Sequence, residues 1–380
     1  MHLVLLFSFE ISLEDWSETG ILAREVLFYQ GVSRRYGVTS KFLTYGGQAD
    51  QECSARLAGI QILPAYRARP TASGRLGRLI TSLFLPWRLH KELGRVDVFK
   101  SNQMMGAWVG VVSKLRFGKP FLLRTGYELS EFLRLGKAPW WHRVGGWILS
   151  YISYQLADRI HVATRADKKI IEKRFRVPAA KIYVQPNWID TRTFSPLRNE
   201  HDEDDGVLFV GRFAEQKNLP LLIDALTTTD LKLTIVGAGK DELRIREKIE
   251  LAEIDAKILG STPNSRMPAL YQQCSIYVIC SRYEGNPKAL LEAMACGCAV
   301  IGTDVIGVRG IIQHGKNGML VKEDVFSLRS AILKLADDRQ LREALGKAAR
   351  ESVLRDYSLD SATEAEWRAY NAMTVESRTR

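Results

Sequence analysis

Cysteine is scarce in this sequence, which holds five in 380 residues. So few cysteines exclude a disulfide framework. Cys296-Gly-Cys298 has no second Cys or His pair at a metal-binding spacing, and the six histidines form no HExxH motif. The sequence therefore predicts no transition-metal site. Apart from Cys53, the cysteines stand in or beside apolar runs, as small buried side chains do in a reducing compartment; these are Cys274, Cys280, Cys296 and Cys298.

Long apolar runs are also missing. The nearest approach to one, at residues 147–157, is interrupted by two serines and Gln155. A membrane-spanning helix needs about 20 apolar residues, so we expect none. Residues 1–10 are apolar without a basic leader, and Glu14 and Asp15 follow them. This pattern is typical of a buried first strand rather than a signal peptide, and we expect a cytoplasmic protein.

Acidic residues are few in the first half of the chain. Residues 1–200 hold 30 Lys and Arg against 16 Asp and Glu, a net charge of +14. Residues 201–380 hold 24 against 27, a net charge of −3. This asymmetry predicts different partners for the two halves. A basic surface attracts nucleic acid, anionic lipid or an acidic substrate, and composition alone does not choose among them.

Short apolar runs alternate with helical patterns along the chain. The alternation is typical of parallel sheets covered by helices on both faces, and its two series predict an α/β protein with two doubly wound domains. We expect a first domain at residues 1–195, a polar linker at 196–205 and a second domain at 206–362, with residues 363–380 packed back on the first. The expected strands are residues 3–9, 38–43, 96–99, 121–123 and 160–162, then 207–210, 231–236, 257–259, 276–279, 300–301 and 319–321.

A helix is expected to begin just beyond a strand within residues 281–297. Asn286 suits its N-cap and Pro287 its first position. The unpaired N–H groups and the positive dipole end of such a helix favour a phosphate. Glu284 precedes the helix and Glu292 lies within it, so both carboxylates can face one pocket and bind hydroxyl groups of a ribose and a sugar. The alternative is a pair of ordinary surface glutamates.

Two further strand-to-helix loops carry candidate residues. Arg212 and Lys217 follow an apolar strand and precede Asn218, which is expected to cap the next helix. Two cations on such a loop can neutralise a diphosphate leaving group, although a solvated loop is the alternative. Gly237-Ala-Gly239 is a weak dinucleotide fingerprint, because Glu242 stands where a third glycine is needed. A tight turn is the favoured interpretation there.

In their order along the chain, these motifs resemble those of the family 4 retaining glycosyltransferases. The resemblance covers nearly all of residues 206–360. It implies the GT-B fold, in which two Rossmann-like domains face each other across a cleft. It also implies transfer from a nucleoside-diphosphate sugar without a metal or other cofactor. The motifs that carry it are Gly211-Arg212 with Lys217-Asn218, Gly237-Ala-Gly239, Glu284 with Glu292, and residues 293–301, 307–310 and 317–320.

The resemblance also implies roles for individual residues. Arg212 and Lys217 would bind the diphosphate, Glu284 the donor sugar and Glu292 the ribose, and we expect Glu284, Arg212 and Lys217 to be catalytic. The nucleotide base would lie near residues 260–262, which begin with Gly260. The remaining donor-binding candidates are glycines and residues at the helix start, namely Gly20, Gly211, Gly237, Gly285, Asn286, Pro287, Lys288, Ala289 and Leu290.

The first half matches the family less tightly. Residues 186–190 resemble its hinge segment with Trp188 in place of a glycine, and Gly20 stands where the family has a glycine-rich loop. Many members carry a His after the strand expected at residues 121–123, but here the segment reads Arg124-Thr-Gly-Tyr127-Glu128. We expect Arg124, Tyr127 and Glu128 on the acceptor side. Tyr127, Glu128 or a backbone carbonyl would face the reacting centre.

Basic and aromatic residues are interleaved at residues 74–91 and 140–147. Basic amphipathic segments can lie on an anionic membrane, and tryptophans suit its interface. The alternative is that these aromatic residues belong to the core. Since members of the family often act on lipid-linked acceptors, we expect association with the inner face of the cytoplasmic membrane.

The leading hypothesis is a retaining hexosyltransferase that acts on a glycan or lipid-linked acceptor in the synthesis of lipopolysaccharide, another surface polysaccharide or a glycolipid. A nucleotide-sugar epimerase of the same fold and a non-catalytic nucleotide-sugar-binding subunit are the alternatives. The basic half would also permit nucleic-acid binding. However, the sequence has no helix-turn-helix, RNA-recognition or zinc motif, so we expect no nucleic-acid partner.

Overall fold

The computed structural model describes residues 1–18, 21–53, 57–66, 74–126, 128–136, 138–196 and 204–378. It divides into two compact units. Unit 1 comprises Met1–Gln185 with Ala362–Arg380, and unit 2 comprises Pro186–Ser361. The chain thus enters unit 2 ahead of the expected linker at residues 196–205, most of which lies outside the described residues. Within the described part of the chain, no helix is long and apolar enough to cross a membrane.

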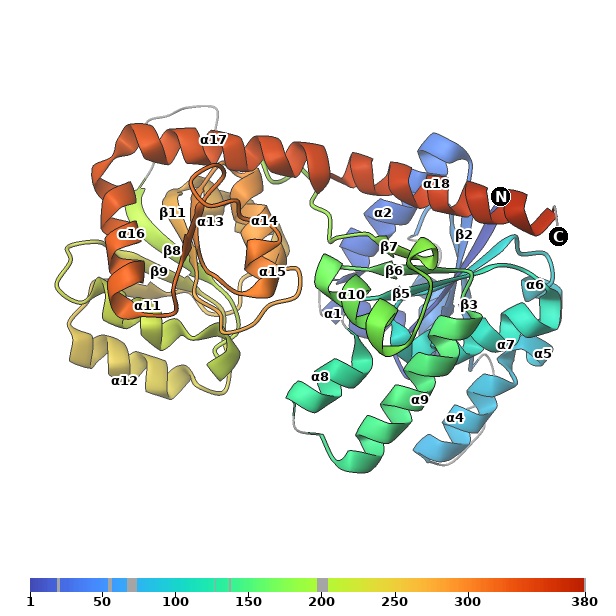
Figure 1. The fold of residues 1–380 in the computed structure, drawn as a ribbon. Helices are drawn as coiled ribbons and strands as arrows, with labels where there is room; N and C mark the ends of the chain where they lie inside the picture. The colour runs from blue at the N-terminus through green and yellow to red at the C-terminus, as the bar shows by residue number, and fades with distance from the viewer. Residues whose placement is uncertain are drawn as a thin grey trace. The chain divides into compact units, whose positions relative to one another are not determined.

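Unit 1 is built on a seven-stranded parallel sheet of order β3-β2-β1-β4-β5-β6-β7 (Figure 1). Two of its strands, β3 and β7, were missed by the sequence pattern. Both lie at sheet edges, and exposed residues interrupt their apolar runs. The strands are β1 (His2–Leu6), β2 (Thr39–Thr44), β3 (Ile60–Pro64), β4 (Val98–Ser101), β5 (Phe121–Thr125), β6 (Arg159–Val162) and β7 (Ile182–Val184).

Helices connect these strands, as crossovers between parallel strands require. They are α1 (Leu13–Glu18), α2 (Ile21–Tyr36), α3 (Gln48–Cys53), α4 (Arg75–Leu83), α5 (Leu85–Arg88), α6 (His90–Leu93), α7 (Ala107–Phe117), α8 (Leu129–Leu135), α9 (Trp140–Leu156) and α10 (Arg165–Arg174).

The C-terminal helix α18 (Leu359–Arg378) packs on unit 1, as expected. The Trp367 ring stacks on Tyr36, with centroids 5.2 Å apart, and Tyr370 is fully buried. Both residues are one helical turn apart, so one face of α18 meets unit 1.

A buried ion pair lies beneath this helix. Lys100 Nζ on β4 is 2.6 Å from Glu366 Oε1 on α18, and both side chains are almost completely buried. His161 Nδ1 on β6 lies 3.5 Å from the other carboxylate oxygen. The Lys100 ammonium also faces the rings of Tyr29 and Tyr370. Pairing is what makes two buried charges tolerable here, because an unpaired buried charge is strongly unfavourable.

Unit 2 is built on a six-stranded parallel sheet of order β10-β9-β8-β11-β12-β13. All six strands coincide with expected apolar runs, and the doubly wound architecture of both units is confirmed. The strands are β8 (Asp204–Val210), β9 (Leu233–Val236), β10 (Ala256–Ile258), β11 (Cys274–Ile279), β12 (Ala299–Thr303) and β13 (Met319–Val321). The helices are α11 (Leu219–Leu226), α12 (Glu242–Ala252), α13 (Met267–Gln272), α14 (Lys288–Ala295), α15 (Ile306–Arg309), α16 (Val325–Asp337) and α17 (Arg339–Asp356).

The core of unit 2 has two layers, one on each face of the sheet. Along β11, Ile276 and Val278 join one buried apolar cluster, whereas Tyr277 and Ile279 join the other. Successive side chains of a strand point to opposite faces, so a strand buried on both faces reads as a continuous apolar run. This is why the sequence pattern located these strands.

Candidate functional site

Loops of unit 2 gather at the carboxyl edge of its sheet. Because β8, β9, β10 and β11 are parallel, the segments that follow them leave from the same edge. Backbone hydrogen bonds join these segments. Phe213 N donates to Ala238 O at 3.0 Å, and Gly237 N donates to Gly260 O at 2.9 Å. The predicted residues Gly211, Gly237 and Gly260 therefore belong to one connected set of loops.

The glycines of the loop after β9 permit this close packing. Gly237 has φ 144°, and a Cβ there would lie 2.0 Å from Gly211 O. A Cβ on Gly239 would lie 2.4 Å from Phe213 O. Only glycine fits positions where backbones approach so closely. The tight-turn interpretation of Gly237-Ala-Gly239 thus has a direct structural reason.

Lys217 and Glu284 form an ion pair at this edge. Lys217 ends a short 3₁₀ turn, Glu215–Lys217, after β8, and Glu284 lies in the loop after β11, the strand next to β8. The Ser281 hydroxyl donates to the same Glu284 oxygen at 2.7 Å. The Glu284 side chain is nearly buried, at 4% exposure. The structure therefore brings two of the predicted residues into direct contact.

Asn218 precedes α11 as predicted, but its side chain does not cap that helix. Its backbone is left-handed, with φ 50°, and its Nδ2 donates to Glu323 Oε1 at 3.0 Å. Asn tolerates this conformation better than most residues do. The residue therefore shapes the chain between Lys217 and α11 rather than satisfying the helix amides.

Arg212 is exposed. Unlike Lys217, it does not contact Glu284 among the described residues. Among the described residues, no hydrogen bond or ion pair holds its side chain. It follows β8 directly, on the same segment as Gly211. Its guanidinium is therefore available to an anionic ligand.

The helix expected near residue 288 is α14, but its N-cap is Pro287, not Asn286. Asn286 Oδ1 instead accepts a hydrogen bond from Asn187 N, and Asn187 Nδ2 donates to Asn286 O, both at 2.8 Å. The capping prediction is therefore wrong, because the amide is engaged by a segment 99 positions away. The first N–H groups of α14, at Lys288, Ala289 and Leu290, have no acceptor within the helix.

The loop ahead of α14 is positioned by a close contact with α15. A Cβ on Gly307 would lie 2.2 Å from Gly285 O and 2.3 Å from Glu284 O. Gly307 therefore lets α15 pack directly against the backbone that carries Glu284. This explains in physical terms why a glycine opens the motif at residues 307–310.

Glu292 lies on α14 and has a different partner from Glu284. Tyr271 on α13 donates its hydroxyl hydrogen bond to Glu292 Oε2 at 2.9 Å. The ring of Tyr277 lies 6.0 Å from that of Tyr271. Burial, and then the charges of Glu284 and Glu292, raise the pKa of Tyr277 well above its usual value. Both carboxylates thus act electrostatically on one buried tyrosine, Tyr277. Tyr271 and Tyr277 were not predicted from the sequence, because neither stands in a recognised motif.

The acceptor-side residues of unit 1 are structurally engaged. Glu128 is buried and caps α8, accepting hydrogen bonds from the Glu131 amide at 2.7 Å and the Ser130 hydroxyl at 2.6 Å. Burial lowers the pKa of Arg124, but Glu25, Tyr29, Glu366 and Tyr370 together outweigh it and the net direction is upward. Gly20 and Tyr127 lie outside the described residues.

Residues 140–147 begin α9, whose large apolar side chains point outward. Its buried residues are Gly146, Ser150, Ser153 and Tyr154. The interpretation of these aromatic residues as core is therefore wrong. The exposed ones are Trp140, Trp141, Val144, Trp147, Ile148, Tyr151 and Ile152.

In residues 74–91, too, large apolar side chains of the helices point outward. Ser82 is the buried residue of α4, whereas an apolar stripe at helical spacing is exposed. The stripe comprises Leu76, Ile80, Leu83, Phe84 and Trp87. Helices α4 and α9 both contact α7, and both reach the lower edge of unit 1 in Figure 1.

Comparison with known proteins identifies the family. The family described as "Glycosyl transferases group 1" matches residues 191–352, and "Glycosyltransferase Family 4" matches residues 34–193. The two matches overlap at residues 191–193 and together cover every strand of the two sheets except β1. The chain belongs to the family 4 glycosyltransferases. In the part of this glycosyltransferase that the structure describes, no three His, Cys, Asp or Glu side chains form a metal-binding group.

Two relatives are each 32% identical to this glycosyltransferase. An uncharacterized glycosyltransferase of Methanocaldococcus jannaschii matches over 199 residues, 51% of this chain and 54% of its own length. The N-acetylgalactosamine-N,N'-diacetylbacillosaminyl-diphospho-undecaprenol 4-alpha-N-acetylgalactosaminyltransferase of Campylobacter jejuni matches over 206 residues, 52% of this chain and 56% of its own. The chain thus spans a little over half the length of these relatives.

One solved structure has the same fold as this chain over nearly the full length of both proteins. The HepE protein of Anabaena, crystallised with UDP, has a TM-score of 0.77 and 14% identity, covering 98% of this chain and 100% of its own. The GT-B architecture expected from the sequence is confirmed.

Proposed function

We propose that this glycosyltransferase moves a hexose, with retention of anomeric configuration, from a nucleoside-diphosphate sugar to a glycan or lipid-linked acceptor. The observation that carries the proposal is the Lys217–Glu284 pair at the carboxyl edge of the unit 2 sheet, because Glu284 lies in the loop that leads into α14. A cation, a carboxylate and free helix amides together suit a ligand that has both phosphates and hydroxyl groups. A nucleoside-diphosphate sugar is such a ligand.

The donor would be held by both polar groups and backbone. Lys217, Arg212 and the first amides of α14 would bind the diphosphate. Glu284 would accept from sugar hydroxyls, and Glu292, oriented by Tyr271, from the ribose. The base would lie against the segment beginning at Gly260.

In the proposed reaction, the protein has to position the two substrates and stabilise the charge on the leaving group. The acceptor hydroxyl attacks the anomeric carbon on the face from which the diphosphate leaves, and the departing phosphate oxygen takes the acceptor proton. One C–O bond forms as another breaks, and the configuration is retained because the incoming and the departing oxygen share one face of the sugar. Lys217 and Arg212 would stabilise the negative charge that develops on the leaving group, and no metal is needed for that role.

Unit 1 supplies the surface for the acceptor. We propose that the enzyme is cytoplasmic and lies on the inner face of the cytoplasmic membrane through α4 and α9. The outward apolar faces of these helices and the positive charge of the first half support this placement. The Campylobacter relative is named for a diphospho-undecaprenol acceptor, which supports a role in surface polysaccharide, lipopolysaccharide or glycolipid synthesis.

Donor-induced thermal stabilisation tests the first step. UDP-, GDP- and ADP-sugars would be screened against the wild type and Lys217→Ala, because a donor raises the unfolding temperature only if it binds the native state. We expect one base series to stabilise the wild type and to lose its effect in the variant. If no nucleotide sugar stabilises the wild type, the proposed donor class is wrong.

A labelled sugar then separates transfer from the two alternatives. In transfer the label leaves the nucleotide for the acceptor and nucleoside diphosphate is released. An epimerase would return the label as an altered nucleotide sugar. A non-catalytic subunit would release neither product.

A further inference from the structure

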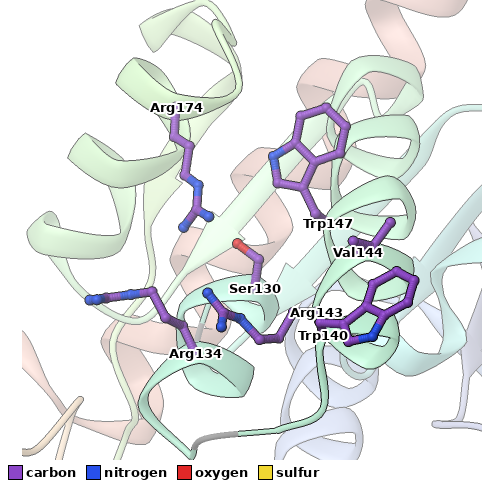
Figure 2. A pocket seen from close by; sticks show the side chains of 7 residues that line it. All are labelled: Ser130, Arg134, Trp140, Arg143, Val144, Trp147 and Arg174. Carbon is purple, nitrogen blue, oxygen red and sulfur yellow. The ribbon is translucent and has the colours of Figure 1, made fainter.

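A cavity of about 380 Å³ opens between α8, α9 and α10 in unit 1. Arginines line one side of it and apolar residues the other. Figure 2 shows the guanidinium groups of Arg143 and Arg174 directed toward the space beside Ser130, with Val144 and two tryptophans on the opposite side. Its third arginine is Arg134, and its tryptophans are Trp140 and Trp147.

Close helix packing builds this cavity. Gly146 lets α8 approach α9, since a Cβ there would lie 2.5 Å from Leu133 Cδ1. On the other side, Phe175 at the end of α10 stacks near Trp147, with ring centroids 6.2 Å apart. These two contacts bring arginines from three different helices to one cavity. The cavity is therefore part of the packed fold.

The cavity has an uncompensated positive charge. Arg134 donates to Glu131 at 2.9 Å, and Arg174 Nη1 lies 3.5 Å from the same carboxylate. The hydrogen bond from Arg134 lowers the pKa of Glu131, so this acid is ionised at neutral pH. Among the described residues, Arg143 has no ion-pair partner. The three arginines outnumber the neighbouring carboxylates, which are Glu131 and the buried Glu128 behind Ser130, so positive charge is in excess around the cavity.

The apolar side of the cavity continues onto an apolar surface. Val144 and Trp147 line the cavity, and Ile148 and Tyr151 extend the same exposed face along α9. A ligand that fits both sides has a strongly anionic head and a hydrocarbon tail. Arginine binds phosphate oxygens through paired N–H groups, which makes phosphate the matching head.

We propose that this cavity binds the dianionic phosphate group of a membrane lipid, whose hydrocarbon chains lie along the exposed face of α9. A phosphomonoester carries about −1.5 to −2 charges at pH 7, more than a phosphodiester does, and is thus the lipid phosphate that a cavity with three arginines favours most. The inference rests on the membrane association proposed above and is independent of sugar transfer.

Vesicle flotation with the full-length protein tests the inference. One set of phosphatidylcholine vesicles would carry phosphatidic acid, a phosphomonoester, and the other phosphatidylglycerol, a phosphodiester, at matched surface charge. We expect the wild type to bind the phosphatidic acid vesicles about tenfold more tightly, and inorganic phosphate at millimolar concentration not to compete. Equal binding to both sets would overturn the inference while leaving membrane association intact. Binding to neither would overturn both, and competition by inorganic phosphate would indicate a soluble ligand.

Two variants and a matched control separate the cavity from general charge. Arg143→Gln removes the unpaired arginine and should abolish the preference for phosphatidic acid. Lys169→Gln removes one charge from an exposed position on α10 and should keep it. Glu131→Gln frees Arg134 and Arg174 and should strengthen binding several-fold. Equal losses in Arg143→Gln and Lys169→Gln, or weaker binding in Glu131→Gln, would contradict the inference.

Discussion

Lys217 and Glu284 form an ion pair between the loops that follow two adjacent strands, β8 and β11. The Glu284 oxygen that accepts from Lys217 also accepts from the Ser281 hydroxyl. Ser281 is itself fixed, because its carbonyl accepts from the Thr303 hydroxyl at 2.6 Å. Glu284 is thus held from two sides before any ligand binds. A phosphate that binds Lys217 has to share or replace this pair.

Lys217→Ala should slow sugar transfer by about 10²-fold or more, the scale of losing one transition-state donor. Steady-state rates of nucleoside diphosphate release at saturating donor would measure it. Lys334→Ala, an exposed lysine on α16, is the control for loss of one charge in the same unit. An undiminished rate in Lys217→Ala would remove this residue from the site.

Tyr271→Phe and Tyr277→Phe should differ in their effects. Tyr271→Phe removes the hydrogen bond to Glu292 and should cost about 1 kcal/mol of stability and weaken donor binding. Tyr277 is equally buried, but its hydroxyl has no hydrogen-bond partner among the described residues, so Tyr277→Phe should be nearly neutral. Urea unfolding and donor titration of both variants would check this. Equal losses in the two would contradict the role assigned to the Tyr271–Glu292 bond.

Gly307→Ala should destabilise the protein by about 2 kcal/mol or more, because the added Cβ would overlap the Glu284 and Gly285 carbonyl groups. It should also lower the transfer rate, since the loop that carries Glu284 must move. Gly310→Ala, in the same motif, meets its nearest atoms at 3.5 Å and is the matched control. Unfolding and rate measurements on both would decide whether the contact positions Glu284. A stable, fully active Gly307→Ala variant would rule that out.

Glu366→Gln should lower the free energy of unfolding at pH 7 by about 3–5 kcal/mol, because it leaves Lys100 buried without its counter-charge. Glu364→Gln, on the exposed face of the same helix, should change stability by less than about 0.5 kcal/mol. Chemical unfolding of both variants would measure the difference. A small loss in Glu366→Gln would mean that the buried pair contributes little.

The lowered pKa of Glu366 predicts a loss of stability in acid. Burial raises the pKa of Glu366, but Lys100 and His161 outweigh it and hold the pKa far below the ordinary value of 4.5. A carboxylate with a lowered folded pKa stabilises fully above its unfolded pKa and loses that contribution as the pH falls below it. The wild type should therefore lose stability below about pH 4.5, more steeply than Glu366→Gln. Identical acid profiles would refute the assignment.

Trp141→Ser with Ile148→Ser should reduce flotation with anionic vesicles without destabilising the fold. Both side chains are roughly half exposed, and exposed substitutions usually change stability by less than about 0.5 kcal/mol. Leu251→Ser, at an exposed apolar residue of unit 2, is the control. If the double variant floats as the wild type does, the α9 face does not contact the membrane.

The sequence predicted unit 2 better than unit 1 for a physical reason. Each unit 2 strand carries an apolar run, as in β11, where both faces are buried. In β3 and β7, exposed positions such as Gln61 and Tyr183 interrupt the pattern. Local periodicity reports burial on a strand's two faces, so it fails where exposed positions break the apolar run. The edge strands β10 and β13 keep short apolar runs and were located.

For the candidate site, the sequence predicted which loops carry the residues, but it did not predict the contacts between those residues. The positions of Lys217 and Glu284 after parallel strands followed from sequence order. The hydrogen bonds of Asn286 did not, because local capping preference gave no indication of Asn187. The pairing of Lys100 with Glu366 likewise joins residues far apart in sequence, and neither residue stands in a motif. Such contacts depend on tertiary packing, which overrides local preference.

The buried pair beneath α18 has a consequence for how the polypeptide acquires its fold. Unit 2 is encoded between two segments of unit 1, so a ribosome makes Lys100 long before Glu366. Until the last helix emerges, Lys100 lacks its ion-pair partner, and the aromatic rings beside it are uncovered on the face that α18 will occupy. Unit 2 has all of its strands by then and can fold first. The segment synthesised first would therefore be the last to reach its native state.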